Sequence, residues 1–210
     1  MADSTFLQAD LQQREQTDQQ INFWLVLLLS FLTLGLWGYY VIWQLVSRRD
    51  RHFRRVARLA EDATVYLRTR AQETGTDLGE TLTRLEGAQR ALRDSAAERG
   101  AAIWTVLCIL TQGLGNLVLW YVLMSDFSKH EAQEAELVAA LNQGFAVLGE
   151  QTSLRLEPQI PDRSYWLYLL FTLITFGLFW IYWYYCLLED PNRHFRAQAD
   201  WEAGLGLLAR

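Results

Sequence analysis

Three long stretches of this chain lack every charged residue and histidine. They run from Ile21 to Val46, from Ala101 to Met124 and from Tyr165 to Leu188. A helix needs roughly 20 apolar residues to cross the hydrocarbon core of a bilayer. Each stretch exceeds that length, so the sequence predicts an all-α integral membrane protein. Its three repeated segments would be transmembrane or re-entrant helices joined by amphipathic helical linkers.

Motifs for the common catalytic centres are also absent. The chain has no nucleophile elbow, phosphate loop, HExxH sequence or paired-cysteine motif. Ion-coupled carriers usually keep an ionisable side chain inside the membrane, and the three apolar stretches offer none besides tyrosine and cysteine. These absences argue against a coupled transporter and predict a protein that is not an enzyme.

Cysteine and lysine are scarce. Cys108 and Cys186 both lie in apolar stretches, where cysteine behaves as a small hydrophobic residue, so we expect no disulfide and no metal site from them. Only Lys129 among the 19 basic residues is lysine. Arginines in residues 47–100 are mixed with acids, which is typical of a solvated helical linker and predicts no nucleic-acid partner. Residues 1–20 show no cleavable signal, so we expect the first stretch to be retained.

The apolar stretches are copies of one unit. A shift of 142 positions aligns the first with the third, and a shift of 78 aligns the first with the second, both without a gap. Each copy has a Thr-x-Gly-Leu signature with a histidine 17 residues after the glycine. The repeated positions are Thr33, Gly35 and His52; Thr111, Gly113 and His130; and Thr175, Gly177 and His194. The repeat therefore extends beyond the apolar stretch into the polar segment that follows.

The signature supports a family resemblance. Thr33 to Trp43 and Thr175 to Tyr185 combine Thr-x-Gly-Leu-aromatic with later tyrosine and tryptophan, and Thr111 to Tyr121 is a weaker match. This pattern resembles a bacterial membrane-protein family of unknown function with repeated Thr-x-Gly-[Ile/Leu]-aromatic and Tyr-Trp segments. The resemblance implies a membrane protein and no particular activity.

The apolar stretches divide the chain into seven regions. We expect a polar N-terminal tail (1–20), membrane segments at 21–46, 101–124 and 165–188, a helical linker (47–100), a helical linker with a proline loop (125–164) and a C-terminal helix (189–210). Thr74-Gly75-Thr76 should end the first linker helix, and Asp77 with Glu80 forms a capping-box pattern for the next one. Asp190 and Pro191 look like the start of a new helix.

Two topologies fit the apolar stretches. Arginines flank the linker at 47–100, which favours three crossings of a bacterial inner membrane, with the N-terminus outside and the C-terminus in the cytoplasm. In the alternative, Gly35, Gly113 and Gly177 break each stretch into a re-entrant hairpin, which would bring the three histidines together. We favour three crossings, in which His130 faces the opposite side from His52 and His194.

Other side chains suggest helix packing and interfacial anchoring. Gln112 and Asn116 are four residues apart, so they should share one helix face and pack against neighbouring helices, or line a pore. The glycines that should permit close helix approach are Gly35, Gly38, Gly113, Gly115 and Gly177. The expected interfacial aromatics are Trp24, Trp37, Tyr40, Trp104, Trp120, Trp166, Trp180 and Tyr182. The aromatic clusters Trp37 to Trp43 and Phe179 to Tyr185 could instead bind a pigment, quinone or lipid.

The three repeated histidines are the residues most suited to binding a metal or haem. No cysteine, aspartate or glutamate repeats with His52, His130 and His194 at ligand spacing, so we favour a structural role and predict no metal and no cofactor. A pH-sensing role is a third interpretation.

The sequence thus predicts a non-catalytic bacterial membrane scaffold or accessory subunit that acts through helix–helix packing in an oligomer or larger membrane complex. A small pore or uncoupled carrier is one alternative, and a cofactor- or pigment-binding membrane subunit is another. The expected partners are the lipid bilayer and further copies of the chain or other membrane subunits.

Overall fold

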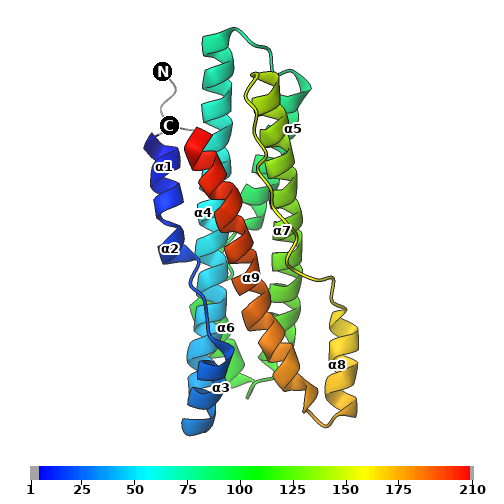
Figure 1. Cartoon of the computed structure of the whole chain (residues 1–210). Helices are drawn as coiled ribbons and strands as arrows, with labels where there is room; N and C mark the ends of the chain where they lie inside the picture. The colour runs from blue at the N-terminus through cyan, green and yellow to red at the C-terminus, as the bar shows by residue number, and fades with distance from the viewer. Residues whose placement is uncertain (1–4, 209–210) are drawn as a thin grey trace.

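The computed structural model describes residues 5–208, and in that range the chain folds into nine helices without a strand (Figure 1). They are α1 (Thr5–Gln12), α2 (Arg14–Thr17), α3 (Phe23–Leu32), α4 (Leu36–Thr74), α5 (Glu80–Ser95), α6 (Ala101–Leu110), α7 (Gly115–Val147), α8 (Tyr165–Ile174) and α9 (Phe179–Leu208). The long helices α4, α7 and α9 form the body of a bundle, and α5 packs against α4 and α7.

Each apolar stretch folds as a helical hairpin. A short arm of ten residues, which is α3, α6 or α8, is followed by a tight turn and the start of α4, α7 or α9. All three turns lie at the same end of the bundle, the lower end in Figure 1. The three repeats therefore enter the bundle in the same direction.

The Thr-x-Gly signature builds these turns. The two residues after each threonine have positive φ: 51° and 91° at Leu34–Gly35, 49° and 92° at Gln112–Gly113, and 51° and 90° at Phe176–Gly177. Each glycine N–H donates to the carbonyl five residues earlier, at 2.7 to 2.8 Å, as in a Schellman motif. Each threonine hydroxyl donates to the last turn of the arm and accepts from the first turn of the long helix. The signature thus forms a tight turn that reverses the direction of the chain between two helices.

These turns overturn the predicted integral membrane fold. Among the described residues, no helix combines the length and the apolar character that crossing a bilayer requires. An arm of ten residues rises only about 15 Å, because a helix gains 1.5 Å per residue. The predicted transmembrane segments, the three crossings of a bacterial inner membrane and the placement of the two termini on opposite sides are therefore wrong. The prediction failed because apolar length was counted across the turn. Of the re-entrant alternative, the structure confirms only the helical break at Gly35, Gly113 and Gly177.

The linker predictions have mixed outcomes. α4 ends at Thr74 with Gly75 at φ 67°, which confirms the predicted break. Asp77 accepts from the N–H of Gly79 at 2.9 Å, one residue before α5, in place of the expected capping box with Glu80.

Proline 191 lies inside α9 and begins no new helix. Proline has no N–H to donate to the carbonyl four residues earlier, which belongs to Leu187. The buried guanidinium of Arg48 donates to that carbonyl at 3.0 Å and to the Leu188 carbonyl at 3.2 Å. A side chain from α4 thus replaces the missing helical bond and lets α9 continue.

The two ends of the described chain meet at the upper end of the bundle. α1 packs against α4 and α9, and the Gln8 side chain donates to the Gly206 carbonyl at 3.1 Å. The predicted N-terminal tail therefore contains two helices, while its residues 1–4, and residues 209–210 of the predicted C-terminal helix, lie outside the described residues.

The interior has three apolar layers. The largest cluster fills the upper bundle around Leu59, Leu137 and Phe145, and a second fills the hairpin end around Trp120 and Trp183. A small group of aromatic rings, Phe53, Phe127 and Phe195, lies apart from both. The three histidines pack against this group, so a polar layer interrupts the apolar core.

Candidate metal centre

The three repeated histidines meet in the interior. His52 on α4, His130 on α7 and His194 on α9 are each fully buried, and their ring centroids are 5.1 to 5.8 Å apart. They reach the same level because each lies 17 residues after the glycine of its turn, and the three turns lie at one end. The prediction that His130 faces the opposite side from His52 and His194 is therefore wrong.

Glu134 completes a group of four possible metal ligands. It lies one helical turn after His130, and one ligand atom from each of the four side chains lies within 4.8 Å of the others. Its carboxylate oxygens are 3.0 Å from Nε2 of His194 and 4.0 Å from Nε2 of His130. Metal–ligand bonds of about 2.1 Å place ligand atoms about 3 to 4 Å apart, so small side-chain rotations suffice to converge on one ion.

Two histidines are oriented by carboxylates behind them. Nδ1 of His52 is 2.8 Å from an oxygen of Asp18, and Nδ1 of His194 is 3.1 Å from an oxygen of Glu131. A proton on Nδ1 satisfies each contact and leaves the lone pair of Nε2 for the cluster; this tautomer is inferred from the hydrogen bonds. Carboxylate–histidine pairs of this kind typically orient imidazoles at metal sites.

Several polar atoms at the centre of the cluster have no hydrogen-bond partner among residues 5–208. They are Nε2 of His52, both ring nitrogens of His130, Nε2 of His194 and Oε2 of Glu134. The last two are close to each other but not aligned as a hydrogen bond. An unpaired buried polar group costs about 1–3 kcal/mol, and so many together are typical of a site that binds something further.

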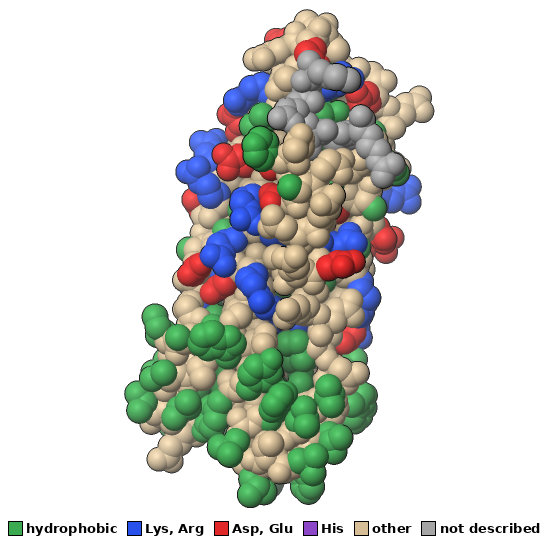
Figure 2. Space-filling view, turned by 90° about the vertical axis from the view of Figure 1, so that its left-hand side faces the viewer, with side chains coloured by type: hydrophobic (Ala, Val, Ile, Leu, Met, Phe, Trp, Pro, Cys, Tyr) green, Lys and Arg blue, Asp and Glu red, His purple; other side chains and the backbone are tan. Residues whose placement is uncertain are grey.

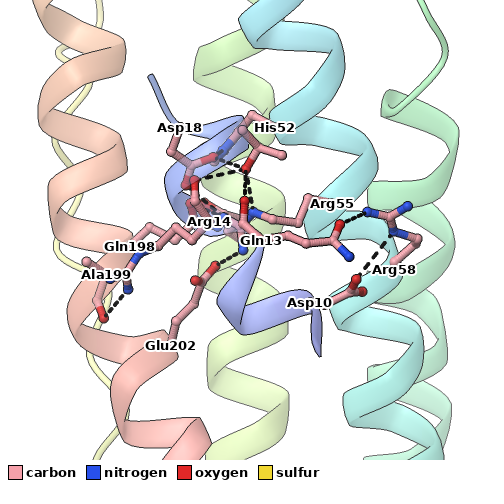
Figure 3. A network of polar contacts seen from close by, with 12 residues as sticks. Asp10, Gln13, Arg14, Asp18, His52, Arg55, Arg58, Gln198, Ala199 and Glu202 are labelled. Atoms are coloured by element: carbon pink, nitrogen blue, oxygen red, sulfur yellow. Dashed lines mark hydrogen bonds and ion pairs between the residues drawn. The ribbon is translucent and has the colours of Figure 1, made fainter. Parts of the chain in front are cut away.

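Buried polar side chains lie next to His52, among them Asp18, Arg55, Gln198 and Glu202 (Figure 3). Arg55 donates to Asp18 at 2.8 Å, to Glu202 at 2.7 Å and to Gln198 at 3.2 Å. Gln198 in turn donates to Glu134 at 2.5 Å. Arg55 is fully buried. It links the Asp18 carboxylate, which contacts His52, and the Gln198 amide, which donates to Glu134, into one network.

Burial and neighbouring charge set the protonation of the cluster. Burial, together with the nearby His52 and His194, holds the pKa of His130 well below its usual value. Burial also opposes the charge on His194, but Glu134 and Glu131 outweigh it and raise the pKa of His194 to about 9. Burial would raise the pKa of Asp18, yet His52 and Arg55 lower it to about 2. The metal-free cluster thus holds ionised and neutral groups side by side.

The repeats contribute unequally to the centre. The position four residues after the histidine is Val56 in the first copy, Glu134 in the second and Gln198 in the third. Glu134, Glu131 and Asp18 were not predicted as site residues, because no acid repeats with the three histidines along the sequence. The signal that could have found Glu134 is its i,i+4 spacing from His130, which places both side chains on one helix face.

The predicted packing residues lie elsewhere. Gln112 is exposed in a turn while Asn116 is in α7, so the two do not share a helix. A Cβ atom added at Gly35, Gly38 or Gly177 would meet no heavy atom within 4 Å, so no helix approaches closely there. Of the predicted packing glycines, only Gly115 is tightly enclosed, by Thr111 and Cys108 of its own hairpin. The repeated glycines serve the turns, and the repeated threonines bond across them.

The predicted interfacial aromatics divide into two groups. Trp120 is buried and its ring centroid is 3.7 Å from that of Trp180, so these two belong to the core of the hairpin end. Trp37 and Trp104 are partly buried against the same core. The exposed members are Trp24, Tyr40, Trp166 and Tyr182.

Comparison with known proteins reaches only the third repeat. A family model described as a domain of unknown function, DUF4234, matches residues 163–209. That segment includes α8, its turn and α9 with His194. The match thus shows a domain of unknown function at the C-terminal repeat, and it brings no activity with it. No curated protein and no solved structure matches the chain.

Proposed function

We propose that this protein binds one divalent transition-metal ion of the zinc type through His52, His130, His194 and Glu134. The observation that supports it is the convergence of four fully buried ligand side chains from three helices, with ligand atoms within 4.8 Å of one another. Imidazole nitrogens and a carboxylate oxygen are usual zinc ligands, and four of them suit tetrahedral coordination.

The arrangement favours a structural role for the ion. Four protein ligands leave a tetrahedral ion no free position for a substrate, which is typical of structural zinc sites. The ion would join α4, α7 and α9, and so the three repeats, at one level of the bundle. Of the functions expected from the sequence, the cofactor-binding alternative is the one this geometry favours; the scaffold and pore functions stay predictions.

A metal-free ion cluster is the competing explanation. His194 in its charged form would bind the carboxylates of Glu131 and Glu134 without any metal. That arrangement accounts for His194 but leaves both nitrogens of His130 and Nε2 of His52 without a partner among the described residues. The metal ion gives every one of the four side chains a ligand role.

Metal analysis of the purified full chain in mild detergent tests the proposal. After gel filtration, elemental analysis should find about one zinc-type ion per chain. After chelator treatment, Co²⁺ should bind with one-to-one stoichiometry and develop the visible absorption of a four-coordinate site. The variant Glu134→Gln keeps side-chain size and should bind Co²⁺ at least about a hundredfold more weakly.

Glu136→Gln is the matched control. Glu136 is on the same helix but is exposed and pairs with Arg84 at 2.5 Å, so its loss should leave Co²⁺ affinity unchanged. Circular dichroism should show equal helix content in all three proteins. If the wild type binds Co²⁺ no better than Glu134→Gln does, the cluster is a metal-free ion network and the proposal is wrong.

A further inference from the structure

One end of the bundle exposes large hydrophobic side chains. Figure 2 shows them gathered at the lower end, whereas arginine, lysine and acidic side chains cover the surface above. The hairpin turns are the most exposed part: Leu34 is 95% and Phe176 is 98% exposed. Other strongly exposed members include Phe31, Leu36, Ile103, Leu110, Leu114 and Leu178. We call this end, residues 21–46, 101–124 and 165–188, the apolar end.

We infer that the apolar end docks into one leaflet of a lipid bilayer without crossing it. Its surface contains no aspartate, glutamate, lysine, arginine or histidine. Moving it into hydrocarbon therefore removes water from no charged side chain. Its ten-residue arms rise about 15 Å, which is half of the roughly 30 Å hydrocarbon core. Depth and composition therefore both match a single leaflet.

Aromatic residues mark the boundary of this end. Trp24 and Trp166 lie at the start of their arms and are 71% and 72% exposed. Tyr40 and Tyr182 are also exposed but lie four and three residues after the starts of α4 and α9, nearer to the turns than to this boundary. Tryptophan and tyrosine favour the headgroup region of a bilayer, where one part of the ring is apolar and another can bond to water. The positions of Trp24 and Trp166 place the lipid headgroups near the first residues of α3 and α8.

Lipid fits this end better than a second copy of the chain does. The exposed apolar side chains come from all three hairpins and from the turns themselves. A second protein copy would cover one side of such an end, whereas a leaflet surrounds all sides. An extended apolar surface on a protein is typically an interaction site.

The charges next to this end predict which lipids it accepts. Arg99 is paired with Asp126, Arg163 with Asp190, and Arg196 with Glu189, at 2.7 to 2.8 Å. Because an acid neutralises each of these three arginines, they present little free positive charge to anionic headgroups. Docking should therefore be driven by apolar contact, and it should depend little on salt or on anionic lipid.

Flotation of the full chain with phosphatidylcholine vesicles tests this inference. The wild type, diluted from detergent, should float with the vesicles at low and at high salt. In the variant Leu34→Asp plus Phe176→Asp, the new carboxylates must enter hydrocarbon, and the vesicle-bound fraction should fall about tenfold or more. Both native side chains are almost fully exposed, so this variant keeps the internal packing.

The matched control places the same charges at the opposite end. Phe6 in α1 and Leu207 in α9 are 70% and 65% exposed, and Phe6→Asp plus Leu207→Asp should float as the wild type does. Lipids brominated midway along the acyl chain should quench tryptophan fluorescence in the wild type. They should not do so in Leu34→Asp plus Phe176→Asp, which we call the tip variant.

Two outcomes would overturn the inference. The first is a wild-type chain that stays in the dense fraction as a defined oligomer, which would show that a second copy covers the apolar end. The second is a tip variant that floats as well as the wild type. Flotation is independent of metal, so Glu134→Gln should float normally even if it binds no ion.

Discussion

The histidine layer and the apolar end contrast within the same three repeats. In the histidine layer, ionisable side chains are fully buried: His52, His130, His194 and Glu134 have no exposed surface. At the apolar end, large hydrophobic side chains reach 98% exposure at Phe176. An ordinary globular protein buries the second kind of side chain and exposes the first. Both regions depart from that pattern, in opposite directions.

The contrast indicates that each region has a partner outside the chain. Buried ionisable groups are costly unless they are paired or bind a metal, and extended apolar surface typically marks an interaction site. One repeat produces both regions, because its turn sets the exposed tip and its 17-residue spacing from glycine to histidine sets the level of the ligands. The two partners can therefore be tested separately on one fold.

The largest expected effect is stabilisation by the metal ion. A ligand present at a thousand times its dissociation constant raises the free energy of unfolding by about 4 kcal/mol if it binds only the folded chain. Zinc at that excess should raise the midpoint of urea unfolding of the wild type, and a chelator should lower it. His130→Ala should unfold at the same urea concentration with and without zinc. Equal responses of both proteins would place any bound zinc outside the histidine layer.

A buried carboxylate beside the histidine layer gives the next effect, on the pH dependence of stability. Burial raises the pKa of Glu202 from 4.5 to about 7 against the opposing charge of Arg55 from α4. The other charged groups that act on it are Asp18, which follows α2, and Glu134 from α7. A raised folded-state pKa contributes stability in full below pH 4.5, and this contribution is lost as pH rises through 7.

Replacing this carboxylate by an amide should flatten the pH profile. Between pH 4.5 and 8 the free energy of unfolding of the metal-stripped wild type should lose up to about 3 kcal/mol through Glu202, at 1.36 kcal/mol per pKa unit. Glu202→Gln cannot titrate, so its profile should lack this decline, as urea unfolding at each pH would measure. Glu136→Gln, at an exposed site, should keep the wild-type slope. Parallel profiles of wild type and Glu202→Gln would contradict the prediction.

A smaller effect is expected from the carboxylate behind His52. Asp18→Asn weakens the orientation of that imidazole, and loss of such an outer partner typically lowers metal affinity 10- to 100-fold, about 1.4–2.7 kcal/mol. Asp190→Asn is the matched control, because Asp190 pairs with Arg163 and contacts no proposed ligand. Competition with a chromophoric chelator measures both affinities. A similar loss in the two variants would mean that the effect is general destabilisation.

The sequence showed the repeat but did not show that each apolar stretch folds back as a hairpin. The register of Thr33, Gly35 and His52 in each copy predicted three equivalent units, and the all-helical content and the break at Gly75 are confirmed. Apolar length alone could not distinguish one long helix from a hairpin, because the turn at Leu34 and Gly35 depends on backbone conformation. The amino-acid composition does not indicate that Leu34 adopts a left-handed backbone conformation.

The metal centre was harder to predict than the fold. Its histidines repeat, but Glu134 comes from one copy only, and Asp18 lies outside the repeats. These acids meet the histidines through tertiary contacts between helices distant in sequence. Only the i,i+4 spacing of His130 and Glu134 was visible locally, and many exposed helices show the same spacing.

The smallest expected effect separates the turn from the helix that follows it. Gly35 has φ 91°, where a side chain is strained by about 1–2 kcal/mol, while Gly38 lies within α4. A Cβ atom added at either position would meet no heavy atom within 4 Å, so the two substitutions differ only in backbone conformation. Gly35→Ala should therefore lower the free energy of unfolding by about 1–2 kcal/mol, whereas Gly38→Ala should raise it by about 0.5–1 kcal/mol. Urea unfolding of both variants measures the difference, and equal shifts would mean that the chain continues through Gly35 as one helix, which would remove the hairpin that brings the histidines together.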